Sequence, residues 1–212
     1  MRLFRSNAVV LACLALSACA GISQSGSWRD PQFGGPALKN VLVVAAGDAQ
    51  TQRRIVEDTL SNVLRQWGVR AAVSYTAVDA VKGDNAAGIV GLPAVQAALR
   101  SAGADGALVV RVLRVDRGYN SGPSFGVGVG GGSGGWGGGW SGGGVGVSIP
   151  IGGGDGTSAA DATTVEAAMT SMASGKLVWS ATYSLNGALD AGAAAERLSR
   201  QIVTDLRKDA VI

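Results

Sequence analysis

Residues 40–47 read NVLVVAAG, an apolar run that ends in glycine. Such a run, without polar alternation, is typical of a strand buried on both faces of a sheet. Residues 50–67 then place apolar side chains at helical spacing, and Gly68 follows in the position where helices commonly end. Residues 69–75 have the composition of a second strand. The domain is therefore predicted to open with a β-α-β unit.

The rest of the chain predicts further strands and helices around one mixed sheet. Residues 76–91 are loop-like, and Pro93 and Gly103 bracket a predicted helix over 92–101. Three more strands and a final helix are predicted at 107–115, 163–172, 177–185 and 190–208. The predicted order is β-α-β-α-β, a glycine-rich excursion, and then β-β-α, in the α/β (α+β) class. The core is expected from residues 41–44, residues 108–112 and the face that carries Leu177, Trp179 and Tyr183.

The N-terminus predicts an exported, lipid-anchored protein. Arg2 and Arg5 precede a short apolar run that ends in Leu16-Ser17-Ala18-Cys19, which combines the positive end, apolar core and small residues of a secretory signal. The stretch resembles the signals of bacterial lipoproteins, which implies cleavage before Cys19 and acylation of that cysteine. An ordinary cleaved signal and an uncleaved helix are the alternatives, but the run is shorter than the ~20 residues of a spanning helix.

The resemblance also implies a location. In such lipoproteins an aspartate after the cysteine favours retention in the inner membrane, whereas this chain has Ala20. We therefore expect the periplasmic face of the outer membrane.

Composition excludes several functional classes. The 212-residue chain has no histidine, which is the commonest general base and metal ligand. Besides Cys19 its one other cysteine, Cys13, would be removed with the signal peptide, so no disulfide is expected within the mature chain. The 18 Lys and Arg nearly balance the 15 Asp and Glu and form no basic cluster, so nucleic acid is not expected as a partner. We expect no catalytic residue, no cofactor and no metal.

The composition also divides the chain into four parts. Residues 1–18 are the predicted signal peptide. Residues 19–39 are rich in Gly and Pro and are the predicted tether, whose Trp28 and Phe33 are expected to pack on the edge of the domain. Residues 40–121 and 157–212 together form one α/β domain, because they suffice for a single core. Residues 122–156 are a glycine-rich, low-complexity insertion.

The insertion has a pattern of its own. Valines alternate with glycine in two arms on either side of a centre that holds two tryptophans, and these are the candidate partner-contact residues: Val127, Val129, Trp136, Trp140, Val145 and Val147. Three interpretations stay open. The segment is a flexible excursion, a sticky extension that contacts a partner or the bilayer interface, or a membrane-inserted hairpin of an oligomeric barrel. Against the last, each arm is shorter than the ~9–11 residues of a spanning strand.

Motifs that could carry catalysis or binding fail on spacing. Gly126, Gly128 and Gly131 approach a dinucleotide fingerprint, but no helix follows them. Glu57 and Asp58 are adjacent on a helix, point about 100° apart, and are expected to be solvated beside Arg53 and Arg54. Asp48 is expected to cap the first helix. Three loop aspartates lack calcium-loop spacing: Asp84, Asp155 and Asp161.

Short motifs of the domain resemble a group of small bacterial lipoproteins. Their domain is similar to the α/β modules of the Tol-Pal translocation protein and the curli secretion lipoprotein. The matching segments are residues 39–46, 53–58, 68–75, 103–111 and 175–181, the last reading GKLVWSA. The resemblance implies a fold more than an activity.

We expect a non-enzymatic, lipid-anchored domain that acts through protein contacts in cell-envelope assembly or maintenance. The membrane and an envelope protein are the expected partners, and the sequence leaves the oligomeric state open. An oligomeric secretion or pore component that uses the glycine-rich hairpin is the alternative, and a hydrolase is a distant third.

Overall fold

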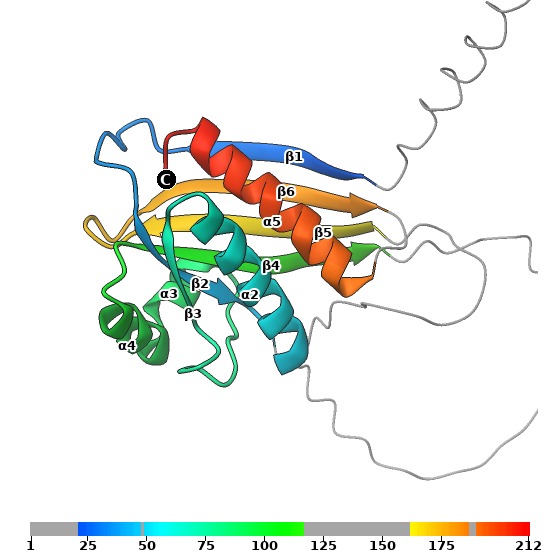
Figure 1. Cartoon of the computed structure of the whole chain (residues 1–212), viewed down its shortest axis with the longest axis horizontal. Coiled ribbons are helices and arrows are strands. Elements are labelled where there is room, and N and C mark those ends of the chain that lie inside the picture. The colour runs from blue at the N-terminus through cyan, green and yellow to red at the C-terminus, as the bar shows by residue number, and fades with distance from the viewer. Residues whose placement is uncertain (1–20, 48, 117–161, 187–189) are drawn as a thin grey trace, which may run out of the picture.

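The structure, a computed structural model, describes residues 21–47, 49–116, 162–186 and 190–212. These residues form a six-stranded mixed sheet in the order β1-β6-β5-β4-β2-β3 (Figure 1). The strands are β1 (Ile22–Arg29), β2 (Asn40–Ala45), β3 (Arg70–Val73), β4 (Gly106–Asp116), β5 (Ala162–Ser171) and β6 (Leu177–Asn186). The helices are α2 (Gln50–Gln66), α3 (Ala86–Gly91), α4 (Pro93–Ala102) and α5 (Ala191–Lys208). The predicted mixed α/β class and the predicted order of these elements from β2 onward are confirmed, with α3 as an addition.

The first half of the sheet is parallel and the second half antiparallel. Strands β3 and β4 both pair with β2 in parallel, as the β-α-β pattern predicts. Strands β4, β5 and β6 form an antiparallel meander. The predicted helix ends are also found, because Gly68 and Gly103 adopt positive φ angles of 81° and 56°, which glycine tolerates best.

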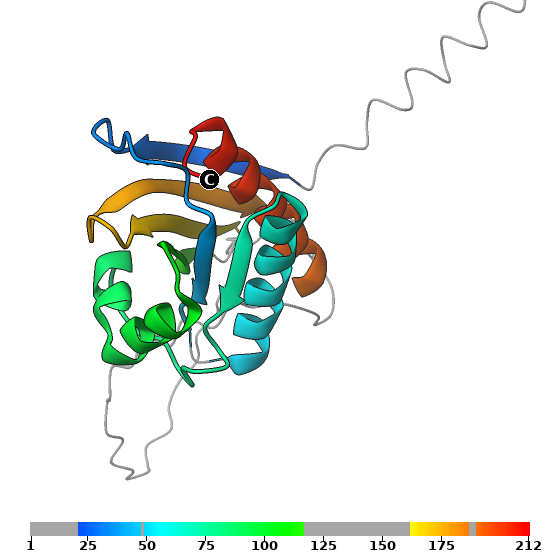
Figure 2. The ribbon, with the colours of Figure 1, turned by 60° about the vertical axis from the view of Figure 1, so that its left-hand side comes forward.

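The helices cover the two faces of the sheet unequally (Figure 2). Helices α2 and α5 pack on one face, where Val43, Leu108 and Trp179 are buried in the larger part of the core. Helices α3 and α4 pack on the other face over β2 and β4, around Leu42, Val44 and Val109. On that second face Ser180, Thr182 and Ser184 of β6 are only partly buried, since the two helices lie at the β2 side of the sheet.

The expected tether is wrong for residues 22–29. They form β1, which pairs antiparallel with β6 from Ile22–Leu185 to Arg29–Trp179 and makes one edge of the sheet. Six of its eight residues are polar or glycine and six are exposed, so the strand gives no apolar signal; an edge strand needs only backbone pairing on one side. Phe33 packs against the core, as expected, whereas Trp28 is 46% exposed.

Two smaller expectations are also corrected. Helix α3 lies in the stretch expected to be a loop; Asn85 caps it by accepting a hydrogen bond from the Gly88 amide at 2.7 Å. Leu177 was expected in the core with Trp179 and Tyr183, but it is 36% exposed. A register shift between Met169 and Thr170 inserts an extra residue in β6, so that Val178 is buried in its place.

Candidate functional site

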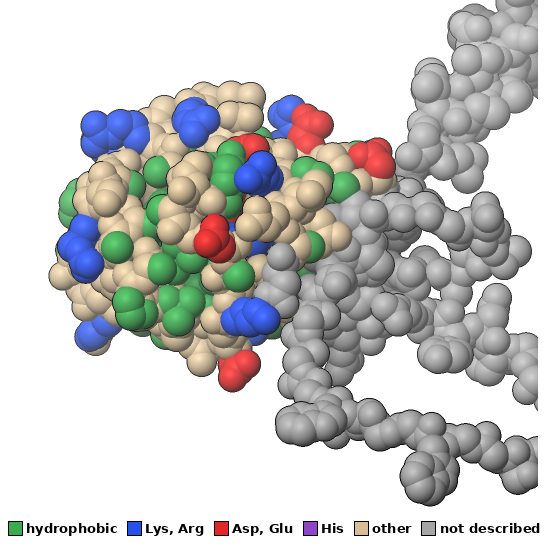
Figure 3. All heavy atoms as spheres, turned by 90° about the horizontal axis from the view of Figure 1, so that it is seen from below, with side chains coloured by type: hydrophobic (Ala, Val, Ile, Leu, Met, Phe, Trp, Pro, Cys, Tyr) green, Lys and Arg blue, Asp and Glu red, His purple; other side chains and the backbone are tan. Residues whose placement is uncertain are grey.

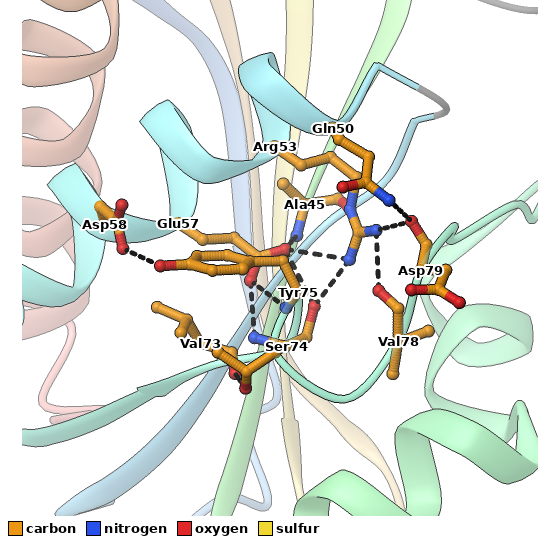
Figure 4. Close-up of polar contacts among 11 residues, drawn as sticks. Ala45, Gln50, Arg53, Glu57, Asp58, Val73, Ser74, Tyr75, Val78 and Asp79 are labelled. Carbon is orange, nitrogen blue, oxygen red and sulfur yellow. Dashed lines mark hydrogen bonds and ion pairs between the residues drawn. The ribbon is translucent and has the colours of Figure 1, made fainter.

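The most concentrated group of buried polar side chains lies where β2 and β3 end (Figure 4). Arg53 and Glu57 stand one turn apart on α2, with exposed fractions of 2% and 0%, and their Nη2 and Oε1 atoms are 3.4 Å apart. Residues four apart lie on the same side of a helix, and here that side faces the sheet. The expectation that Glu57 is solvated is therefore wrong, although its pairing with Arg53 is confirmed.

The Glu57 carboxylate accepts hydrogen bonds from the end of β2 and from the residues that follow β3. Oε1 accepts from the Ala45 amide at 3.0 Å and from the Ser74 hydroxyl at 2.9 Å. Oε2 accepts from the Ser74 and Tyr75 amides at 2.6 and 3.0 Å. One carboxylate therefore joins α2 to the last residue of β2 and to the chain that follows β3.

The Arg53 guanidinium completes the cluster from the other side. It donates to the carbonyl oxygens of Ala45, Val78 and Asp79 at 3.0, 2.9 and 2.7 Å, and to the Ser74 hydroxyl at 3.1 Å. These bonds hold residues 74–79 against the helix. All three nitrogens of the Arg53 guanidinium therefore have hydrogen-bond partners within the protein.

The cluster therefore organises the loops at the carboxyl end of β2 and β3. In the described part of the chain every buried side-chain nitrogen and oxygen has a hydrogen-bond partner. Among the same residues, no group of three or more His, Cys, Asp or Glu side chains could hold a metal ion. Both carboxylate oxygens of Glu57 already accept two or more hydrogen bonds, so its lone pairs serve the fold.

Asp58, next to Glu57, is exposed as expected but has a different partner. Its Oδ1 accepts a hydrogen bond from the Tyr75 hydroxyl at 2.8 Å, and this bond raises the pKa of Tyr75. The Arg54 guanidinium lies 5.3 Å from the centre of the Tyr75 ring. Asp58 and Arg54 of α2 therefore hold the Tyr75 side chain at the surface, next to the buried cluster.

A second feature is one end of the sheet, where several chain connections meet. Ile22 begins β1 and pairs with Leu185, Asn186 ends β6 and pairs with Ala162, and Ala162 also pairs with Asp116 at the end of β4. We call this row of strand ends the entry end. Ile22 follows residues 1–21 in the chain, and Asp116 and Ala162 flank residues 117–161, so the described residues next to both segments lie at this end (Figure 1). The N-terminus and the glycine-rich insertion therefore join the domain at the same end.

The opposite end of the sheet, which we call the closed end, is bound together by polar contacts. Asp105 accepts hydrogen bonds from the Lys39 and Asn40 amides, both at 3.0 Å. Arg29 Nε donates to the Asp209 carbonyl at 2.7 Å, and Trp179 Nε1 donates to the Asp209 carboxylate at 2.8 Å. These bonds fix the last turn of α5 and the chain between β1 and β2.

Two tryptophans are exposed at the closed end. Trp67, at the end of α2, is 53% exposed, and the Arg207 guanidinium lies 3.7 Å from its ring centre. Trp28, near the end of β1, is 46% exposed on the opposite face of the sheet. The face seen in Figure 3 shows apolar side chains between separate Lys, Arg and acidic groups. The helical spacing of residues 50–67 includes Trp67 among the apolar side chains of that helix, whereas the structure places it at the C-cap, beside Gly68, and exposes it.

Most of the sequence-predicted site residues lie outside the described residues. These are Cys19, Val127, Val129, Trp136, Trp140, Val145 and Val147, together with Asp48, Asp155, Asp161 and the three glycines of the rejected fingerprint. The N-cap residue of α2 is Ala49, without a side-chain cap. Asp84 is exposed. Within the described residues no helix has the length and apolar character needed to cross a membrane.

Comparisons with known proteins give distant likenesses in structure only. No protein-family model matches the chain, and no curated protein matches it. A variant of the PelC dodecamer from Paraburkholderia phytofirmans is 17% identical, with a TM-score of 0.43, and the match covers 88% of this chain and 98% of that one. A second PelC dodecamer structure from this organism is 16% identical, with a TM-score of 0.42 and coverage of 87% and 95%.

The lipoprotein GNA1162 from Neisseria meningitidis is 14% identical, with a TM-score of 0.38 and coverage of 82% and 99%. These three structures include neither the Tol-Pal nor the curli module, so that resemblance stays a prediction. Likenesses at this level do not assign a function to the chain.

Proposed function

We propose that this chain is a non-enzymatic domain of the bacterial cell envelope, acylated at Cys19, held on the periplasmic face of the outer membrane, and working through protein contacts in envelope assembly or maintenance. The observation that carries the proposal is the position of β1. The sheet begins at Ile22, three residues after Cys19, at the entry end. A lipid on Cys19 would thus anchor a packed domain almost without a linker.

The buried polar residues support a structural role. Arg53, Glu57 and Ser74 are the residues of the described chain most like a catalytic set, but their hydrogen bonds run to one another and to backbone groups of β2 and of the loop that follows β3. A substrate would have to displace bonds that hold the loops in place. We therefore propose that the domain acts through contacts on its surface and not through chemistry at this cluster.

The exposed tryptophans are the described side chains best suited to a protein contact. Tryptophan and arginine are enriched among residues that dominate binding energy, and Trp67 is already stacked with Arg207. Trp67 is at the closed end, away from the residue that would carry the lipid. A partner in the periplasm could reach it there while the domain stays anchored.

Fractionation with two neighbouring substitutions tests the anchor. Wild-type protein should be acylated and appear in the outer-membrane fraction. Cys19→Ser should leave an unacylated precursor or soluble protein, whereas Ala20→Asp should leave the acylation intact and move the protein to the inner membrane. Intact mass distinguishes the forms. Wild-type mature protein without acyl chains would overturn the proposal.

Crosslinking in whole cells tests the contact surface. Trp67→Ala should remove a crosslinked envelope protein that wild type captures. Leu113→Ala is the matched control, because Leu113 is also a large exposed apolar residue, at 41%, but lies in the half of β4 toward the entry end. Retention of the same partner by both variants would contradict a contact through Trp67.

The alternative function is a component of an oligomeric secretion device or pore. Its specific support is that β4 and β5 stay paired up to Asp116 and Ala162, so the segment that contains the glycine-rich insertion connects two neighbouring antiparallel strands. The size of the native protein extracted in detergent separates the two proposals. High-mass particles that disappear when residues 122–156 are removed would favour the pore, and a small species would favour the contact domain.

A further inference from the structure

We infer that the closed end of the sheet binds an anionic phospholipid surface through a basic patch. The patch consists of exposed Lys and Arg side chains that the fold brings to this end: Lys39, Arg70, Arg100, Lys176, Arg207 and Lys208. The inference goes beyond the proposed function and does not depend on acylation of Cys19. A protein bound at Trp67 and a bilayer would compete for this end of the domain.

The fold gathers the patch from distant parts of a chain that has no basic cluster in its sequence. Lys39 precedes β2 and Arg70 begins β3 beside it, because the Arg70 amide donates to the Lys39 carbonyl at 2.9 Å. Lys176 lies in the turn between β5 and β6. The other three cations lie in the last turns of α4 and α5. A helix C-terminus attracts cations, but half of the patch lies outside the helices, so the helix ends do not account for it.

The acidic side chains of the described residues do not neutralise the patch. None of its members forms an ion pair with a described residue. The acidic side chains at this end are half-buried and accept hydrogen bonds from other groups, namely Asp30 from the Gln32 amide, Asp105 from two backbone amides and Asp209 from Trp179 Nε1.

The fully exposed acidic side chains of the described residues all lie away from the closed end. They are Asp58, Asp79, Asp84, Asp190 and Glu196. In Figure 3 the left margin, which is the closed end, accordingly carries Lys and Arg side chains and no acidic one. The described surface is therefore positive at one end, and the partner that complements it is anionic.

The tryptophans and lysines of the closed end favour a phospholipid surface over an acidic protein. Trp28 and Trp67 are 46% and 53% exposed at this end, and tryptophan is favoured at the level of the headgroups. Lysine and arginine both gain binding free energy near an anionic membrane. Protein interfaces are instead depleted in lysine, which supplies three of the six cations of the patch.

Sedimentation with vesicles tests the inference on the full mature chain, residues 19–212. Every sample carries Cys19→Ser, so that no acyl chain contributes to binding. The vesicles consist of phosphatidylcholine alone or of equal parts of phosphatidylcholine and phosphatidylglycerol. The chain should bind only the vesicles that contain phosphatidylglycerol. Its partition coefficient should fall steeply as salt is added, because salt screens exposed charges.

Two triple variants with the same loss of charge locate the contact. The patch variant carries Lys39→Gln, Arg70→Gln and Lys208→Gln. Each cation near an anionic membrane strengthens binding about fivefold, so this variant should bind about a hundredfold more weakly. The control variant removes three exposed cations outside the patch, with Arg54→Gln, Arg197→Gln and Arg200→Gln. It should bind within about threefold of the unsubstituted chain, because charges beyond a Debye length are largely screened.

The possible results separate the lipid contact from the proposed function. Equal weakening of both variants would show that net charge and not the patch drives binding, and a chain that ignores phosphatidylglycerol would show that the closed end does not recognise this lipid; either overturns the inference. If the patch variant loses a protein crosslinked at Trp67 while no chain binds vesicles, the proposed protein contact stands and the inference fails. Wild-type protein without acyl chains would overturn the proposed anchor, whereas vesicle binding by the patch would still support the inference.

Discussion

Replacement of Glu57 by glutamine tests whether the buried polar cluster holds the loops at the end of β2 and β3. The substitution keeps the shape of the side chain but turns one acceptor oxygen into an NH₂ donor. Either orientation of the amide is unfavourable, because Oε1 faces the Ala45 amide and the Ser74 hydroxyl while Oε2 faces the Ser74 and Tyr75 amides. At least one backbone amide must lose its acceptor, and Arg53 loses its counter-charge.

The magnitude follows from these losses. A buried donor left without a partner costs about 1–3 kcal/mol, and removal of one member of a buried ion pair costs about 3–5 kcal/mol in all. With a urea m-value of about 2 kcal/mol/M, the unfolding midpoint should fall by about 1.5–2.5 M. Urea titration followed by tryptophan fluorescence measures it, since Trp179 is fully buried in the same core.

The neighbouring carboxylate provides the control. Asp58→Asn changes the same charge one residue along the helix, but Asp58 is exposed and bonds only the Tyr75 hydroxyl among the contacts described above. Its midpoint should stay within about 0.5 M of wild type, as for most surface substitutions. A Glu57→Gln midpoint equal to that of Asp58→Asn would refute the reasoning, because it would mean that the buried carboxylate contributes no more than a solvated one.

Three further predictions concern the core and the insertion. Trp179→Ala should lower the free energy of unfolding by about 3–5 kcal/mol, because it empties a fully buried position, and an unchanged urea midpoint would place Trp179 on the surface. Burial and the hydrogen bond to Asp205 raise the pKa of Tyr183 above its ordinary 10.0, so its phenol stabilises the fold below about pH 10 and this contribution is lost as the pH rises further. Wild type should therefore lose more stability than Tyr183→Phe between pH 9 and pH 11, and parallel losses would contradict this. Replacement of residues 122–156 by a short turn should leave the thermal midpoint unchanged within a few degrees, since Asp116 and Ala162 are already paired; a chain that fails to fold would show that the insertion belongs to the sheet.

The sequence predicts the elements whose side chains carry the fold. The apolar run of β2, the helical spacing of α2 and α5, and the glycines that end α2 and α4 all reflect local patterns that survive in the structure. The final helix, predicted over residues 190–208, is found at Ala191–Lys208, with the Asp190 carboxylate accepting a hydrogen bond from the Ala193 amide at 2.9 Å. Such features need no knowledge of distant contacts.

The parts that sequence analysis missed depend on distant partners. β1 is polar, and its place is fixed by backbone pairing with β6, whose paired residues lie 150 or more positions along the chain. The burial of Glu57 requires residues 74–79 to fold over α2, so its spacing from Arg53 alone did not distinguish a solvated pair from a buried one. For α3, Ala86, Ile89 and Val90 have helical spacing, but six residues are too few to separate that pattern from a loop.

The pairing of β1 with β6 has a mechanical consequence. In a chain held by a lipid at Cys19 and pulled by a partner at the closed end, the load enters at Ile22 and runs along the axis of β1. The hydrogen bonds to β6 are perpendicular to that axis, so they resist together as a shear joint rather than opening one after another. At the far end, the bond from Arg29 to the Asp209 carbonyl transfers part of the load to α5. The polar strand β1 would then carry the mechanical load between the anchor and the domain. The force that it resists would depend on the number of its hydrogen bonds to β6, and so on its length, and not on its side chains.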